Sequence, residues 1–97
     1  MRLIIKARLP TEAGNKMLDD PDGIKKIEDY LNKVKPEAAY FSEENGERTF
    51  YIVVDIPSAD MMPAIGEPLY HLGAKVEMHP AMVLDDVKKA MQRMQSS

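Results

Sequence analysis

The sequence contains no cysteine. This absence excludes disulfide bonds, thiolate metal sites and a cysteine nucleophile, and it is typical of a reducing compartment. We therefore expect a cytoplasmic protein. Only two histidines are present, His71 and His79, and neither stands in a spacing that gathers several ligands. We predict no metal site and no cofactor.

Long apolar runs are also missing. The opening segment "MRLIIKARLP" is short and interrupted by charge, and no run approaches the roughly 18 apolar residues of a membrane span. The formal charge of −3 offers no broad attraction to phosphate backbones or anionic lipid. We expect neither nucleic acid nor a membrane as a partner.

What is present is the composition of a globular domain, with 44% hydrophobic and 30% charged residues. The length predicts one domain over residues 1–97 with no linker. A domain of this size buries only roughly two-thirds of the surface of its unfolded chain. Contact with a partner is therefore favoured.

Alternating apolar and polar residues predict strands at 2–9, on both sides of Asn45-Gly46, and at 74–80. Asn-Gly is the strongest short signal for a two-residue hairpin turn, because both turn positions need positive φ. Closing the turn there places Tyr40 opposite Tyr51 and Phe41 opposite Phe50. The hairpin thus presents a Phe pair on one face and a Tyr pair on the other.

Apolar residues spaced by three and four predict helices between these strands. A short helical turn is expected over 11–20, and a longer helix with Asp20 as N-cap and Pro21 as first residue ends at Lys35-Pro36. Another helix follows Ser58 and ends at Gly73, with Pro68 expected to kink or split it. Because 58–72 is rich in Met, Gly and Pro, it serves either as ordinary core or as a mobile lid.

A last helix is expected from Leu84 to Gln95, with four apolar side chains directed inward: Leu84, Val87, Met91 and Met94. The order of elements is then β-α-β-β-α-β-α. This order predicts an α+β protein of ferredoxin-like βαββαβ fold with an added C-terminal helix. Its four-stranded antiparallel sheet would carry helices on one face only.

The two faces of this predicted sheet differ in character. The face expected under the helices is almost entirely apolar: Leu3, Ile5, Ala7, Ala39, Phe41, Phe50, Ile52, Val54, Val76 and Met78. The open face is mixed: Ile4, Lys6, Arg8, Ala38, Tyr40, Ser42, Tyr51, Val53, Asp55, Glu77 and His79. A face directed only at water rarely needs so many apolar and aromatic groups. We expect a second copy of the sheet to cover it.

The predicted order of elements, the half-polar open face and "AKVEMHPAM" before an acidic-started helix resemble the dimeric α/β-barrel proteins of ferredoxin-like fold. The segments "KPEAAYFSEENGERTFYIVVDI" and "MMPAIGEPLY" are similar to a group of bacterial proteins of about this length that remain uncharacterised. The resemblance spans nearly the whole chain. The superfamily includes monooxygenases, isomerases, haem-handling enzymes and ligand-sensing modules, so the resemblance implies a fold and a homodimer but no single reaction.

Three functions fit these observations. In the first, a small, partly apolar molecule binds between the two sheets, in contact with six side chains: Arg8, Tyr40, Tyr51, Asp55, Glu77 and His79. The second is a cofactor-independent enzyme of monooxygenase or isomerase type, with His79 or Asp55 moving a proton. The third is a purely structural dimerisation module, in which the side chains of the two sheets fill the space between them.

Overall fold

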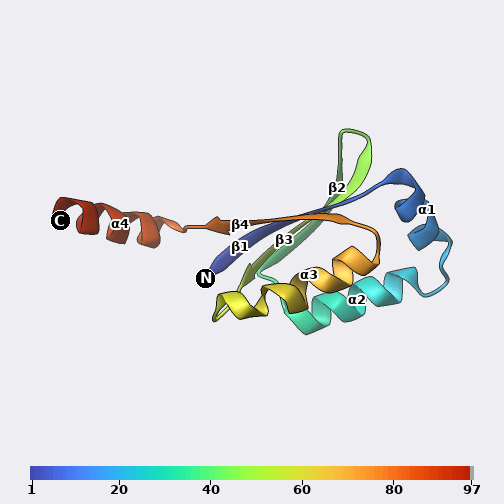
Figure 1. Cartoon of the computed structure of the whole chain (residues 1–97), viewed down its shortest axis with the longest axis horizontal. Helices are drawn as coiled ribbons and strands as arrows, with labels where there is room; N and C mark the ends of the chain where they lie inside the picture. The colour runs from blue at the N-terminus through green and yellow to red at the C-terminus, as the bar shows by residue number, and fades with distance from the viewer. Residues whose placement is uncertain (97) are drawn as a thin grey trace.

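The computed structural model describes residues 1–96. Within them the chain forms four strands, four α-helices and one short 3-10 turn (Figure 1). In chain order these are β1 (Arg2–Leu9), α1 (Thr11–Asp19), α2 (Gly23–Val34), β2 (Ala38–Glu44), β3 (Glu47–Asp55), η1 (Ala59–Met61), α3 (Met62–His71), β4 (Lys75–Ala81) and α4 (Leu84–Ser96).

The strands form one antiparallel sheet in the order β2-β3-β1-β4. The predicted α+β class and the four-stranded antiparallel sheet are therefore confirmed, and the arrangement is compatible with a ferredoxin-like fold. The connection between β1 and β2 differs from the prediction, because α1 is a helix of nine residues rather than a single turn.

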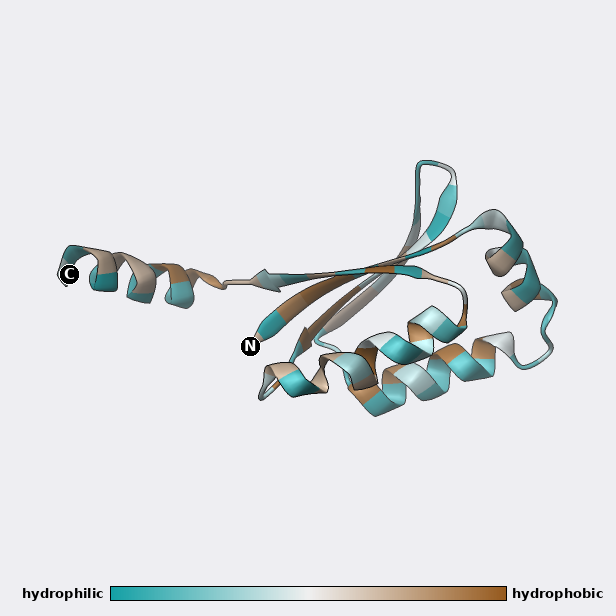
Figure 2. Ribbon diagram, viewed as in Figure 1, coloured by the Kyte–Doolittle hydropathy of each residue, from teal (hydrophilic) through white to brown (hydrophobic). Residues whose placement is uncertain are grey.

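The core lies between the sheet and α2 and α3 (Figure 1). In β1, Leu3, Ile5 and Leu9 are completely buried, and their neighbours in sequence point to the opposite face. Ile52 and Val54 of β3 extend the same apolar layer. Figure 2 shows hydrophobic residues running along the central strands, as the predicted division of the sheet into two faces requires.

The hairpin has the predicted register. Tyr40 pairs with Tyr51, and Phe41 pairs with Phe50. Asn45 and Gly46 both have positive φ, 53° and 79°, so the turn residues adopt the conformation that a type I′ loop requires. A local sequence signal therefore decided which residues share each face of the hairpin.

The start of α2 differs from the prediction. The helix begins at Gly23 after Asp22, so Asp20 and Pro21 are not its N-cap and first residue. The carboxylate of Asp20 accepts the backbone N–H of Asp22 at 2.9 Å and forms an ion pair with Lys26 at 2.6 Å. Asp20 thus stabilises the turn before the helix and the first turn of the helix itself.

The prediction that Phe41 belongs to the core is wrong. Its side chain lies on the helix-covered side of the sheet but is 54% exposed. It packs edge-to-face against Phe50, with ring centroids 5.0 Å apart. The reason is that β2 is the edge strand and no helix closes over Phe41, so one aromatic ring of the pair is left at the surface.

The prediction that α4 packs inward is also wrong. The helix contributes no buried residue, and Leu84, Met91 and Met94 are among the exposed large apolar side chains. It continues from the end of β4 as an arm directed away from the body (Figure 1). The radius of gyration is 15.9 Å, compared with about 13 Å for a compact domain of 100 residues.

The segment 58–72 is part of the core. Ile65 and Leu69 of α3 are buried, and the short turn η1 precedes the helix. Pro68 does not split α3, which continues through it to His71. The helix ends where Gly73 adopts a φ of +88°, a conformation that favours glycine.

Substituting Gly73, which lies between α3 and β4, tests how these two elements are joined. Gly46, in the hairpin turn, also has positive φ and serves as the reference. In Gly46→Ala we expect a loss of about 1–2 kcal/mol from the left-handed backbone alone. Gly73→Ala adds a steric conflict, because its Cβ would lie 2.9 Å from the Cβ of Ala13. Urea denaturation followed by circular dichroism should therefore show the larger destabilisation for Gly73→Ala. Equal losses would contradict the close packing of α1 against this turn.

Candidate functional site

The open face of the sheet is organised in transverse rows that cross all four strands. The pairing of β1 with both neighbours, and of β2 with β3, defines the rows. One row contains Tyr40, Tyr51, Lys6 and Glu77, and the next contains Ala38, Val53, Ile4 and His79. The two rows together form what we call the central face.

The central face combines an exposed apolar strip with charges. Ile4 is 42% exposed although it lies on the central strand β1, and Tyr40 on the edge strand β2 is 67% exposed. Val53 and Tyr51 are half-buried beside them. These side chains leave apolar surface in contact with water, and hydroxyl groups stand next to it.

Lys6 is the electrostatic centre of this face. Its Nζ lies 2.9 Å from Oε2 of Glu44 and 3.4 Å from Oε2 of Glu77. The hydrogen bond from Lys6, with its charge, lowers the pKa of Glu77, and the adjacent His79 lowers it further. In turn, the hydrogen bond to Glu44 raises the pKa of Lys6. The row thus holds a cation between two carboxylates.

The sequence did not indicate the role of Glu44. In a flat sheet Glu44 pairs with Glu47 at the tip of the hairpin, far along the strand from Lys6. The hairpin curls out of the plane of the sheet (Figure 1), as strongly twisted two-stranded ribbons do. This curl carries the Glu44 carboxylate back over the open face, and no local sequence pattern predicts it.

His79 lies at the edge of the central face. Its Nε2 is 3.4 Å from Oε1 of Glu77, and the imidazole is 60% exposed. Glu77 therefore bridges Lys6 and His79, and the carboxylate can orient the imidazole ring. Of the six predicted residues, Tyr40, Tyr51, Glu77 and His79 lie together in these two rows.

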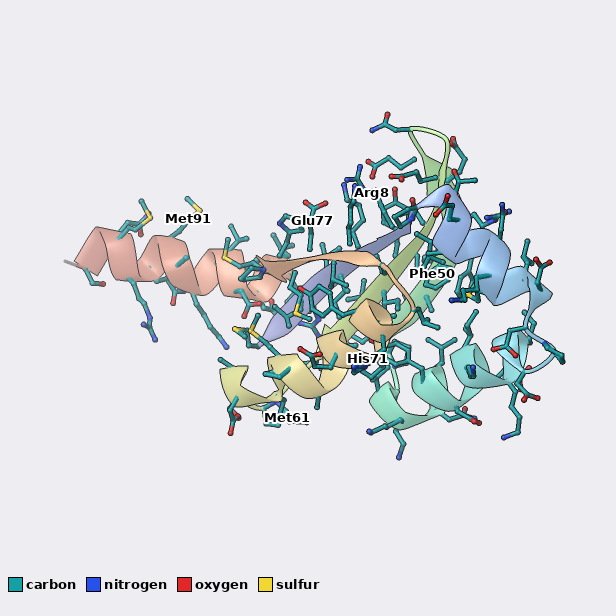
Figure 3. The ribbon with its side chains drawn as sticks, turned by 45° about the vertical axis from the view of Figure 1, so that its right-hand side comes forward. Arg8, Phe50, Met61, His71, Glu77 and Met91 are labelled. Carbon is teal, nitrogen blue, oxygen red and sulfur yellow. The ribbon has the colours of Figure 1, made fainter. Side chains whose placement is uncertain are left out.

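Arg8 occupies the next row toward the hairpin end of β1. Its Nε is buried and has no hydrogen-bond partner among the described residues; the nearest carboxylate, that of Glu47, lies 3.9 Å away. A buried donor without a partner costs about 1–3 kcal/mol. Figure 3 shows Arg8 and Glu77 projecting from the same side of the sheet, opposite to Phe50 and His71.

Asp55 lies at the other end of the open face. It accepts the N-terminal ammonium of Met1 at 3.2 Å and is 3.8 Å from Arg2. Six residues of β1 separate its row from that of Arg8, a distance of about 20 Å along a strand. Asp55 and Arg8 therefore cannot contact the same small molecule in one chain, and the ion pairs of Asp55 give it a structural role.

A hollow lies on the other side of the sheet. A groove of about 330 Å³ lies between α2, the end of α3 and the hairpin strands. Its lining residues are Lys26, Ile27, Tyr30, Leu31, Phe41, Phe50, Ile52, Pro68, Leu69, His71 and Leu72. We call this the helix-face groove, and none of the six predicted site residues lines it.

Tyr30 forms the floor of the helix-face groove, and its polar atom is already used. The hydroxyl donates a hydrogen bond of 2.8 Å to the carbonyl oxygen of Ile65. Burial raises the pKa of Tyr30 to about 12, so the phenol stays protonated at physiological pH. The groove therefore offers an apolar surface, with Lys26 and His71 as its cationic or titratable lining residues.

Sequence reasoning did not find this groove. It assigned Phe41 to the core. The groove is lined by residues from α2, α3 and the hairpin strands, which are far apart in the sequence, so it is a tertiary feature. The exposed Phe41 ring is the clearest mark of it.

No protein-family model and no curated protein sequence matches this chain. Among residues 1–96, none of the helices combines the length and the apolar character that crossing a bilayer requires. The same residues contain no group of three or more His, Asp or Glu side chains positioned to hold a metal ion.

Replacing Lys6 tests the charge arrangement of the central face. In Lys6→Met we expect the pKa of Glu77 to rise toward its ordinary value of 4.5, because the hydrogen bond and the cation are both lost. The depressed pKa makes Glu77 stabilising above pH 4.5, and this contribution disappears as pH falls through the lowered value. The variant should therefore lose less stability on acidification.

Carboxyl-detected NMR titration measures the pKa, and urea denaturation across the acidic range measures the stability. Lys25→Met is the matched control, because Lys25 pairs only with Asp29 on the exposed side of α2. An unchanged Glu77 titration in Lys6→Met would show that Lys6 does not set it.

Proposed function

We propose that the chain is a homodimeric, small-molecule-binding protein of the dimeric α/β-barrel type, built on a βαββαβ ferredoxin-like core. Two copies cover each other's open sheet faces and enclose a ligand between them. The observation that carries this proposal is the central face, where apolar and aromatic side chains stay exposed beside paired charges.

A second copy is the partner that suits this surface best. Stacked sheets pack about 10 Å apart, so Ile4, Val53 and Tyr51 of two copies would meet in one layer. A two-fold axis brings the same patch of each chain together, and most soluble oligomers use this symmetry. Burial of the apolar strip then supplies the main driving force.

The side chains of the central face define the chemistry of the ligand. The rings of Tyr40 and Tyr51 provide flat apolar contact and hydroxyl groups, and Lys6 provides a cation. Arg8 has an unused buried donor at the edge of the same surface. A partly apolar molecule carrying an anionic or carbonyl oxygen satisfies all of these groups.

The pair formed by Glu77 and His79 favours a second candidate, a cofactor-independent enzyme of monooxygenase or isomerase type. A carboxylate 3.4 Å from an imidazole can orient the ring for proton transfer. His79 is the base in this candidate. Asp55 is not proposed for that role, because it is bound to the N-terminus and to Arg2.

A charge in the apolar strip tests the dimer. We expect Val53→Glu to shift the protein toward monomer, because a carboxylate at this position would be buried without a partner between the two sheets. Sedimentation velocity at micromolar concentration measures the shift. Asn32→Glu on the exposed surface of α2 adds the same charge and should leave the dimer unchanged. A wild-type chain that is monomeric at this concentration would refute the shared cavity.

Binding of the amphiphilic anion anilinonaphthalene sulfonate, with native mass spectrometry of the complex, tests the ligand site. We expect Tyr51→Ala to weaken binding by about tenfold, equivalent to about 1.4 kcal/mol. Leu31→Ala, in the helix-face groove, is the control and should bind as the wild type does. Weaker binding to Leu31→Ala and unchanged binding to Tyr51→Ala would place the small-molecule site in the groove. Unchanged binding to both variants would favour a purely structural dimer.

A further inference from the structure

The helix α4 has an apolar side that contacts nothing in its own chain's core. Met82 and Val83 connect it to β4, and they are exposed together with Leu84 and Met91. Figure 2 shows hydrophobic residues at the start of this arm, mixed with polar ones further along. Leu84, Val87 and Met91 recur at spacings of three and four, so they share one side of the helix.

The start of α4 is well built for a helix. The carboxylate of Asp86 accepts the backbone N–H of Val83 at 3.1 Å, and Asp85 and Asp86 lie in the first turn, where acids are favourable. Isolated helices shorter than about 12–15 residues are nevertheless marginal in water. A 13-residue helix with its apolar side exposed therefore needs a surface to bind.

The helix-face groove is the matching concave surface, but α4 cannot reach the groove of its own chain. Only residues 82 and 83 separate β4 from α4, and two residues span at most about 7 Å. The arm runs away from the body, whereas the groove lies beneath the sheet. Figure 3 shows Met91 on the arm, far from Phe50 and His71.

We infer that α4 of one copy binds in the helix-face groove of a second copy, and that the exchange is reciprocal. An amphipathic helix in an apolar groove is a common mode of recognition, with side chains spaced by three and four residues as anchors. The anchors here are Leu84, Val87 and Met91, and methionine adapts well to irregular surfaces. Phe41, the exposed aromatic of the groove, is the contact that α4 buries.

The charges of α4 and of the helix-face groove are complementary. The first turn of α4 is acidic, and the groove is lined by Lys26 and His71. Lys26 already binds Asp20 at 2.6 Å, so its attraction for a further carboxylate is reduced. Apolar burial is therefore the main contribution, and charge favours one direction of the helix over the other.

Reciprocal exchange gives each chain two contact areas, one helix and one groove. A stable interface buries about 800 Å² on each partner, and a two-fold axis closes the pair without leaving an open chain of copies. The inference does not depend on the proposed sheet-face site.

Because the chain has no cysteine, disulfide trapping between two variants tests the exchange directly. Met91→Cys and Phe41→Cys are prepared separately in the full-length protein, mixed and oxidised gently. We expect a covalent heterodimer of one copy of each, identified by its mass. Asn32→Cys, exposed on the far side of α2, replaces Phe41→Cys as the control and should not react efficiently with Met91→Cys.

Tyr40→Cys tests the alternative that α4 binds to the open sheet face of the second copy instead of the helix-face groove. If Met91→Cys reacts with Tyr40→Cys but not with Phe41→Cys, α4 lies on the open sheet face and the inference is wrong. Failure with both positions likewise overturns it. Val53→Glu changes the sheet-face contact and not the contact of α4 with the groove. It therefore tests the proposed function, whereas the cysteine variants test the exchange of α4.

A pair of double variants tests the energy of the exchange without reaction chemistry. Leu84→Ser with Met91→Ser removes two anchors, and Lys89→Ser with Arg93→Ser changes exposed residues on the opposite side of the same helix. We expect the first to raise the dissociation constant of the oligomer by about tenfold or more, as loss of two buried apolar side chains implies, and the second to change it little. Since α4 contributes no buried residue, both should retain the folded core, which circular dichroism checks. Equal dissociation constants would overturn the inference.

Discussion

The structure depends on the position of β1 in the middle of the sheet. This strand pairs with β3 on one side and β4 on the other, and every second side chain on it is fully buried. Because side chains alternate along a strand, that single constraint fixes the side to which α2 and α3 must bind. It also fixes Ile4, Lys6 and Arg8 on the side that the helices of the chain leave open.

The surfaces that remain uncovered are the consequence of having few elements. One sheet and two packed helices bury one apolar layer, and the rest of the apolar surface is distributed over three places: the central face, the helix-face groove and the side of α4. Each combines apolar side chains with charged ones. Because a small domain rarely exposes three such surfaces at once, we propose that a second copy covers them.

The local signals in the sequence predicted much of the fold. Asn45-Gly46 predicted the hairpin register down to the Tyr40–Tyr51 pair, because positive φ at two successive positions admits few alternatives. Alternation predicted the faces of all four strands. The N-cap predicted at Asp20 was a local signal that the structure did not follow. The two larger errors concerned features without a local signal: the exposure of Phe41 on the edge strand, and whether α4 folds back. Both depend on distances between elements far apart in the sequence.

For the candidate site, the sequence by itself determined the membership of the open face, since strand period and hairpin register place Tyr40, Tyr51, Glu77 and His79 on one side. Only the tertiary structure decided which of those residues are neighbours. It separated Arg8 from Asp55 by the length of β1, and the twist of the hairpin brought Glu44 to Lys6. The physical reason is that period is a property of a few consecutive residues, whereas twist, packing distance and the direction of a terminal helix are properties of the assembled chain.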